Sequence, residues 1–177
     1  MQKNYPDLRY KKTVDFLKNH FSPGCAILDL GTPNELSKII DKEGYIVFNT
    51  NGEDLDVHYK VIDEFPSWNY TAFEIFEHMF SPFNILNHIK QGRIVISVPL
   101  NVWFSPAYWN ENDKWDQHYH EFEPRQLNSL LHRTGWTIIH AETWTSPDKL
   151  RFGLRPLLRY IWPSYYFVYA VKIKPWK

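Results

Sequence analysis

The amino-acid sequence predicts one α/β domain over residues 1–177, built on a mostly parallel sheet. Short apolar runs bounded by turn residues alternate with segments of helical periodicity, a pattern typical of parallel strands covered on both faces. The length of 177 residues and the hydrophobic content of 44% suit one continuous core. No internal repeat, low-complexity tract or linker divides the sequence.

The first half of the chain predicts two helices and three strands. Apolar side chains recur with helical spacing over residues 13–21 and stop at a Ser-Pro-Gly turn. A second helix is predicted over residues 34–42. The strands are predicted in the three apolar runs, at residues 26–30, 45–48 and 70–73.

The second half predicts a helix over residues 83–90 and a strand over residues 93–98, followed by a loop rich in aromatic residues. A further helix is predicted over residues 124–134, ended by a glycine. The last two strands are predicted at residues 136–141 and 166–173. Because the segment between them is interrupted by prolines, they are expected to form an antiparallel hairpin.

Charge and cysteine content narrow the function classes. Lysine plus arginine and aspartate plus glutamate each number 20, so no global field attracts nucleic acid or an acidic membrane. The single cysteine, Cys25, excludes an internal disulfide framework and suits a reducing compartment. No leader-like segment and no apolar run near the roughly 20 residues that span a bilayer are found, so a soluble, cytoplasmic protein is expected.

Four motifs occur in a fixed order. Ile27-Leu28-Asp29-Leu30-Gly31 is an apolar run that ends in a glycine, and Glu74-Ile75-Phe76-Glu77-His78 follows a predicted strand. Residues 92–99 form a strand that ends in Ser-x-Pro. Residues 120–127 read His-x-Phe-x-Pro-x-x-Leu, with Gly135-Trp136 beyond them.

From Cys25 to Ile173, the order of these motifs resembles class I S-adenosylmethionine-dependent methyltransferases, especially the broad group of methyltransferase domains. The resemblance implies a Rossmann-like methyltransferase fold with an antiparallel C-terminal strand. The fold is expected to be somewhat reduced, because few residues separate Asn51 from Phe73. The implied cofactor is S-adenosylmethionine.

The resemblance also implies where the cofactor binds, at the carboxyl ends of the strands. The implied residues are Asp29, Gly31, Thr32, Asn51, Glu53, Phe73 and Glu74. The family pattern Asp-x-Gly-x-Gly-x-Gly is degenerate here, because Pro33 and Glu35 occupy its second and third glycine positions. The alternative is a plain strand-to-helix turn, capped by Thr32 or Asn34, with Glu35 in the first helical turn.

A metal site is a second implied feature. Glu74, Glu77 and His78 have i, i+3, i+4 spacing, and His118 and His120 add nitrogens downstream. The pattern has a weaker, local similarity to small-RNA terminal 2′-O-methyltransferases and also to ubiquinone-pathway O-methyltransferases. The former resemblance implies Mg²⁺ or Mn²⁺ at Glu74, Glu77, His78 and His120. Alternatively, the Glu-His pair only shapes the pocket, and His120 is a general base or a hydrogen-bonded structural residue.

Two other segments have open interpretations. Trp103, Phe104, Tyr108, Trp109 and Trp115 either line an acceptor site or cover apolar surface. Arg151, Arg155 and Arg159 are spaced by four residues, so this face either meets phosphate, a lipid head group in peripheral membrane contact, or a partner, or it is a solvated edge.

The function expected from this sequence is methyl transfer to an oxygen of a small or glycan- or lipid-linked acceptor. A non-catalytic binding relative with a degenerate cofactor loop is one alternative. An RNA 2′-O-methyltransferase is another, although the neutral net charge argues against nucleic acid.

Overall fold

The computed structural model describes residues 8–145 and 154–173, with the side chains of residues 154–156 excepted. Along the chain, the helices and strands are α1 (Leu8–His20), β1 (Ala26–Asp29), α2 (Glu35–Lys42), β2 (Ile46–Asn49), the 3₁₀ helix η1 (Tyr59–Glu64), β3 (Asn69–Phe73), the 3₁₀ helix η2 (Phe76–His78), α3 (Pro82–His88), β4 (Gly92–Pro99), α4 (Pro124–Arg133), β5 (Thr137–Trp144), α5 (Leu154–Ile161) and β6 (Tyr165–Lys172). No helix in the described ranges is long and apolar enough to span a bilayer.

Every predicted helix and strand is present, with shifted ends. The largest shift is in α1, which begins at Leu8 instead of residue 13. Its first residues are partly or fully exposed, so they carry no apolar periodicity that could have revealed them. Strand β5 likewise extends to Trp144, beyond the predicted residue 141, through residues that are mostly exposed.

The sheet has six strands in the order β2-β1-β3-β4-β6-β5. Strands β1, β2, β3 and β4 pair in parallel, whereas β6 is antiparallel to both β4 and β5. This confirms the mostly parallel sheet with an antiparallel C-terminal strand. Because β2 and β3 lie on opposite sides of β1, the carboxyl ends of β1 and β3 flank the switch point at which open α/β sheets bind ligands.

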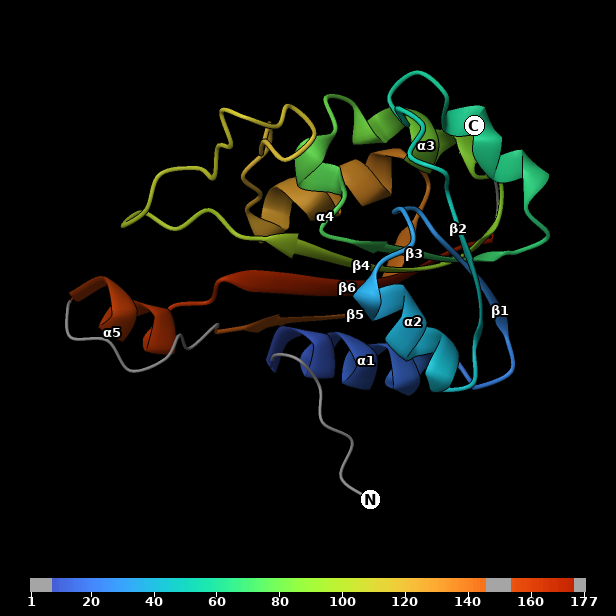
Figure 1. Cartoon of the computed structure of the whole chain (residues 1–177), viewed down its shortest axis with the longest axis horizontal. Coiled ribbons are helices and arrows are strands. Elements are labelled where there is room, and N and C mark those ends of the chain that lie inside the picture. Colours follow the sequence, from blue (N-terminus) through green and yellow to red (C-terminus); the bar gives the residue numbers. More distant parts are fainter. Residues whose placement is uncertain (1–7, 146–153, 174–177) are drawn as a thin grey trace.

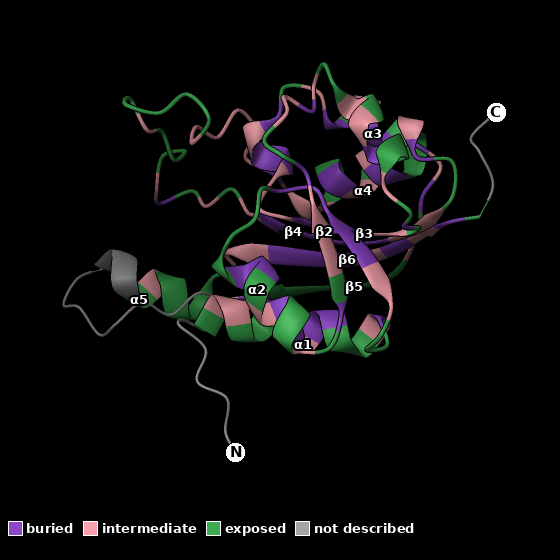
Figure 2. Cartoon of the chain, turned by 45° about the vertical axis from the view of Figure 1, so that its right-hand side comes forward, coloured by how far each residue is buried: buried purple, intermediate pink, exposed green. Residues whose placement is uncertain are grey.

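Helices cover both faces of the sheet, with α1 and α2 on one face and α3 and α4 on the other (Figure 1). Successive side chains of a strand point to opposite faces, so Ile27 of β1 packs with α1 and α2 while Leu28 packs with the residues of the other face. Strands β1, β3, β4 and β6 are largely buried between these two layers, whereas most of β5 is exposed (Figure 2). The continuous apolar runs of the sequence therefore reflect two-sided burial.

The connection between β2 and β3 is short. Residues 50–68 are all described, and they contain η1 but no α-helix and no further strand. The expected reduction of the fold is therefore located here, and β2 is left as the edge of the sheet. The same residues begin at the carboxyl end of β2, so the short connection forms part of the wall of the site described below.

Helix α5 lies in the connection between β5 and β6. Pro156 is its third residue, where the helix loses no internal hydrogen bond to the missing N–H. Of the predicted basic series, Arg155 and Arg159 belong to this helix, and Arg151 lies outside the described residues.

Candidate functional site

The loop after β1 is a strand-to-helix turn with a well-formed cap. The Asn34 side chain accepts a hydrogen bond from the Ser37 amide at 3.0 Å, and the Asn34 amide donates to Ser37 Oγ at 2.9 Å. This capping box starts α2 at Glu35. Asn34 therefore provides the helix cap that was expected if this loop is a plain strand-to-helix turn. The cap leaves room for a ligand site beside the loop.

Gly31 is the closely approached residue of this loop. It is buried, and a Cβ atom added to it would lie 3.1 Å from Ile75 Cδ1 and 3.4 Å from Asp29 Oδ2. Pro33 and Glu35, which replace the other glycines of the family pattern, are exposed.

A cavity of about 540 Å³ lies over Gly31 at the carboxyl ends of the parallel strands. Four segments line it, namely residues 30–32 after β1, residues 50 and 52–56 after β2, residues 75 and 78–80 after β3, and Lys114, Trp115 and Tyr119 from the aromatic loop. Neither Pro33 nor Glu35 contributes to the lining. The cavity is within the range of about 300–1,000 Å³ that is typical of small-molecule sites.

The predicted cofactor residues divide into two groups. Gly31, Thr32 and Glu53 line the cavity. The other four, Asp29, Asn51, Phe73 and Glu74, are outside its lining.

Beside the cavity, Asn51 and Glu53 form one turn, in which the Asn51 amide donates to Glu53 Oε2 at 2.7 Å. Hydrogen bonds from backbone amides, its own first, lower the pKa of Glu53 and keep this carboxylate charged.

Sequence reasoning missed Gly52, which lines the cavity with a φ of +91°. A side chain here would be strained, and its Cβ would lie 3.3 Å from Thr32 Cγ2. The available signal was the Asn51-Gly52 pair directly after a strand, because this dipeptide marks a turn with positive φ. The β2 loop thus supplies a second glycine that faces the β1 loop.

Asp29 organises the strand ends instead of facing the cavity. Its carboxylate accepts hydrogen bonds from Thr71 Oγ1 at 2.8 Å and from Asn49 Nδ2 at 3.0 Å, and Asn49 also donates to the Gly31 carbonyl. Burial raises the pKa of Asp29 to about 7, against the lowering effect of these hydrogen bonds. One carboxyl group therefore joins β1, β2 and β3 beneath the loop.

We expect Asp29→Asn to flatten the dependence of stability on pH. Because the folded-state pKa of Asp29 is about 7, compared with 3.8 for an exposed aspartate, the folded chain binds more protons than the unfolded chain between these two pH values. The wild-type free energy of unfolding should therefore fall from pH 4 to pH 7, by up to about 4 kcal/mol from this group. Urea unfolding of both proteins across this range measures the difference in their free energies of unfolding. This difference should change with pH below pH 7 and level off above it. A difference that does not depend on pH would contradict the assignment.

Glu77, next to the cavity-lining His78 in the chain, is completely buried. Neither carboxylate oxygen of Glu77 has a hydrogen-bond partner among the described residues. Burial, and then the charge of Glu74, raise the pKa of Glu77 well above its usual value. Burying a carboxyl group without a hydrogen-bond partner lowers the stability of the fold. Such a group in a native structure therefore points to a functional role, for example as a ligand of an ion.

Glu77, His78 and His118 form a potential metal-binding group. One ligand atom from each lies within 4.8 Å of the others. Ligands at about 2.0–2.3 Å from one ion are at most roughly 4.6 Å apart, so small side-chain movements would suffice. His78 also borders the cavity, which places this group beside it.

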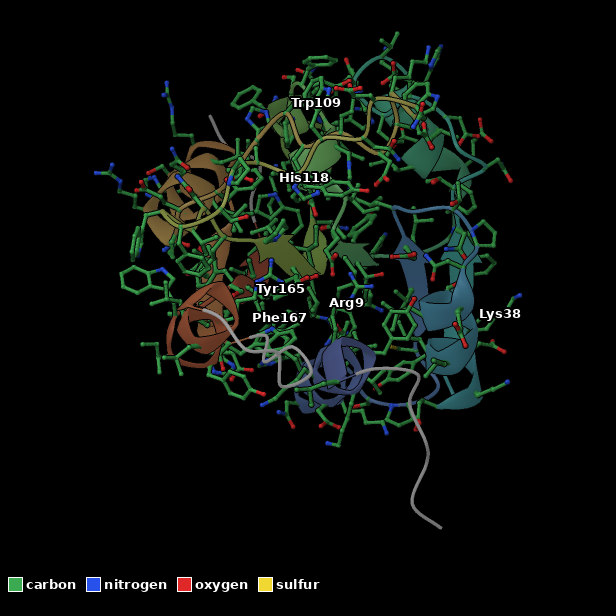
Figure 3. The ribbon with its side chains drawn as sticks, turned by 60° about the vertical axis from the view of Figure 1, so that its left-hand side comes forward. Arg9, Lys38, Trp109, His118, Tyr165 and Phe167 are labelled. Carbon is green, nitrogen blue, oxygen red and sulfur yellow. The ribbon has the colours of Figure 1, made fainter. Side chains whose placement is uncertain are left out.

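The group differs from the ligand set implied by the sequence. Glu74 forms an ion pair with Arg9 of α1, and it is the one described non-glycine residue with positive φ. His120 Nε2 lies 3.2 Å from the Phe80 carbonyl oxygen. Figure 3 shows His118 on the opposite side of the sheet from Arg9. The structure therefore groups His118, and not Glu74 or His120, with Glu77 and His78.

Local backbone hydrogen bonds explain why His118 belongs to the group and His120, which the sequence implied, does not. The amides of Tyr119 and His120 both donate to the Glu77 carbonyl oxygen, at 2.7 and 3.2 Å. These bonds fix the backbone of the loop against η2, and the His118 ring packs edge-on against His78 with ring centroids 4.9 Å apart. Spacing within a motif cannot reveal which of two alternate histidines faces inward.

Residues of the aromatic loop both line the cavity and cover apolar surface. Trp115 and Tyr119 line the cavity, and Tyr119 stacks on Phe80 with ring centroids 3.9 Å apart. Phe104 is buried and covers apolar surface. Trp103 and Trp109 are exposed.

No protein-family model and no curated protein matches the chain, whereas solved structures do. A putative S-adenosylmethionine-dependent methyltransferase from Listeria monocytogenes has a TM-score of 0.60 at 13% identity, over 94% of this chain and 99% of that one. The chain has a methyltransferase fold. A methyltransferase of this fold from Methanosarcina mazei has a TM-score of 0.61 at 10% identity, over 97% and 99% of the two chains.

The magnesium protoporphyrin IX methyltransferase from Synechocystis, whose structure contains bound S-adenosylhomocysteine, is also similar. Its TM-score is 0.57 at 12% identity, over 93% of this chain and 81% of that one. At such low identity the likeness concerns the fold. The chemistry of this chain must be argued from its own residues.

Proposed function

We propose that this protein binds S-adenosylmethionine in the cavity over Gly31 and transfers its methyl group to an oxygen atom of a second substrate. The observation that carries the proposal is the cavity itself, which lies at the switch point of a methyltransferase fold. Three neighbouring strand ends and the aromatic loop enclose it.

The degenerate glycine loop is compatible with this function. Proline removes an N–H and glutamate adds bulk, but both side chains are exposed and neither lines the cavity. Gly31 remains where the backbone borders the cavity, and Gly52 permits a similarly close approach from the β2 loop. Two glycines, from two different loops, therefore border the cavity.

Methyl transfer requires an acceptor oxygen placed in line with the sulfonium methyl group. Holding the two reactants in contact supplies most of the rate enhancement, and the acceptor hydroxyl loses a proton as the new bond forms. His120 is the candidate acceptor of this proton, because His118 belongs to the Glu77 group and is a potential metal ligand. Burial, and then the nearby His78, lower the pKa of His118, which favours the uncharged imidazole that binds a metal.

The Glu77 group fits a divalent ion, because a cation would satisfy the two carboxylate oxygens that have no partner among the described residues. Glu77, His78 and His118 would hold Mg²⁺ or Mn²⁺, and the two imidazoles favour Mn²⁺. Such an ion would polarise the acceptor hydroxyl and so favour its deprotonation. Glu74 and His120, which the sequence motif also implied, are not part of this group.

Isothermal titration calorimetry with S-adenosylmethionine and S-adenosylhomocysteine, with and without Mn²⁺, tests the proposal. Saturable binding of both compounds to one site per chain is expected. Binding of neither would favour the alternative of a non-catalytic relative with a degenerate loop. The acceptor class, small or linked to a glycan or lipid, requires an activity screen against each.

An RNA 2′-O-methyltransferase is the remaining candidate function, and the Glu77 group favours it. The same group serves any metal-assisted transfer to oxygen, however, and 20 basic residues are balanced by 20 acidic residues. RNA affinity with a strong salt dependence would be needed to revive this candidate.

We expect Trp115→Ala to weaken S-adenosylmethionine binding about tenfold, because an aromatic wall of the cavity contributes roughly 1–1.5 kcal/mol. Trp109→Ala is the matched control, since Trp109 belongs to the same loop but lies outside the cavity lining. Calorimetric titration of the two variants measures the difference. Equal affinities in both variants would place the cofactor away from the aromatic loop.

A further inference from the structure

Helix α5 lies at the same end of the sheet as the cavity. It connects Trp144, the last residue of β5, to Tyr165, the first residue of β6, and these two residues pair with each other. Tyr165 also pairs with Pro99 at the carboxyl end of β4. Figures 1 and 2 show α5 projecting to one side of the body at this end.

The projecting helix is apolar and exposed. None of its described side chains is buried, and Leu157 and Ile161 are 61% and 68% exposed. Trp162, directly after the helix, is 43% exposed and contacts Trp103 edge-to-face, with ring centroids 6.5 Å apart. We call Trp103, Leu157, Ile161 and Trp162 the α5 surface. A soluble surface seldom concentrates such large apolar side chains without a partner.

Charge on this segment has one sign. Residues 151–162 contain three arginines and no acidic residue, whereas the whole chain is neutral. At 100° per residue, Leu157 and Ile161 share one side of α5, and Arg159 lies on a different side and is exposed. The helix therefore combines an apolar side, a cationic side and an adjacent pair of tryptophans.

We propose that the α5 surface docks on a lipid bilayer that contains anionic head groups. A short helix with an apolar side, arginine on its other side and tryptophan at its end is suited to lie in the plane of the head-group region. The net positive charge of residues 151–162 is complementary to anionic lipid, and α5 projects outward from the body (Figure 2).

Docking in this way turns the catalytic end of the sheet toward the membrane. Trp103 belongs to the same aromatic loop whose Trp115 lines the cavity, so an acceptor carried on a lipid would approach along this loop. This consequence rests on the proposed function, but the docking itself does not. Of the acceptor classes considered, it selects the lipid-linked one.

Vesicle co-sedimentation of the whole chain tests the docking, with phosphatidylcholine alone and mixed with phosphatidylglycerol. Binding to the mixed vesicles is expected, and it should weaken with added salt. Ile161→Asp should reduce the partition constant about tenfold or more, because an apolar side chain no longer leaves water. Arg159→Gln should reduce it about fivefold on mixed vesicles only, which corresponds to roughly 1 kcal/mol per arginine.

Ile139→Asp is the matched control, because Ile139 is also exposed, at 58%, but lies on β5 outside the α5 surface. It should bind vesicles like the wild type. Absence of wild-type binding, or equal losses in both isoleucine variants, would overturn the proposal. A dimer in sedimentation equilibrium that Ile161→Asp dissociates would replace the bilayer by a second copy of the chain. Titration of each variant with S-adenosylhomocysteine separates failure of docking from failure of the proposed function.

Discussion

Gly31→Val is expected to weaken binding of S-adenosylmethionine about a hundredfold, which corresponds to roughly 2.7 kcal/mol. The first atom of a new side chain would already lie 3.1 Å from Ile75 Cδ1, and Ile75 itself lines the cavity. The branched methyl groups of valine would then occupy the space over the loop or push Ile75 into it. Calorimetric titration measures the affinity directly.

Pro33→Val is the matched control for this substitution, because it introduces the same side chain two residues later at an exposed position outside the lining. Affinity close to that of the wild type is expected. Circular dichroism and thermal unfolding should show that both variants fold. Equal losses of affinity in the two variants would mean that the cofactor does not lie over Gly31.

The second large effect is expected at Glu77. In Mn²⁺ at a hundred times its dissociation constant, the wild type should gain about 2.7 kcal/mol of stability, or roughly 5–10 °C in Tm. Glu77→Gln should lose most of this gain, because a neutral amide attracts a dication weakly. Without the ion, the variant should be at least as stable as the wild type, since it removes an ionisable group that is buried without a partner.

Glu74→Gln distinguishes the ligand group in the structure from the set implied by the sequence. Glu74 pairs with Arg9 and is not part of the Glu77 group, so its Mn²⁺-dependent gain should be retained. His118→Ala should lose the gain and His120→Ala should keep it. Differential scanning calorimetry with and without Mn²⁺ measures all four variants, and the reverse histidine result would restore the sequence-based set.

The inner strands could be predicted because burial on both faces gives them continuous apolar runs, as in β1 and β4. The start of α1 could not be predicted, because its first turn is exposed and lacks apolar periodicity. The hairpin of β5 and β6 could be inferred from the prolines between them. These successes rest on local composition.

The site was harder to predict than the fold. Gly31 could be placed by the run that precedes it, but Gly52 makes its contact with Thr32 across two loops that are distant in sequence. Asp29 was expected in the cofactor site, yet its carboxylate holds Thr71 and Asn49 on the neighbouring strands. The inward position of His118 depends on backbone hydrogen bonds to Glu77 that no spacing rule contains.

A crystal structure with S-adenosylhomocysteine tests the central claim most directly. The account predicts the ligand in the cavity over Gly31, between the β1 loop and the turn at residues 50–56, with Trp115 or Tyr119 against it. Pro33 and Glu35 should remain outside the contact surface. A ligand bound at another place in a well-ordered crystal would contradict the account, and so would an empty cavity at saturating concentration.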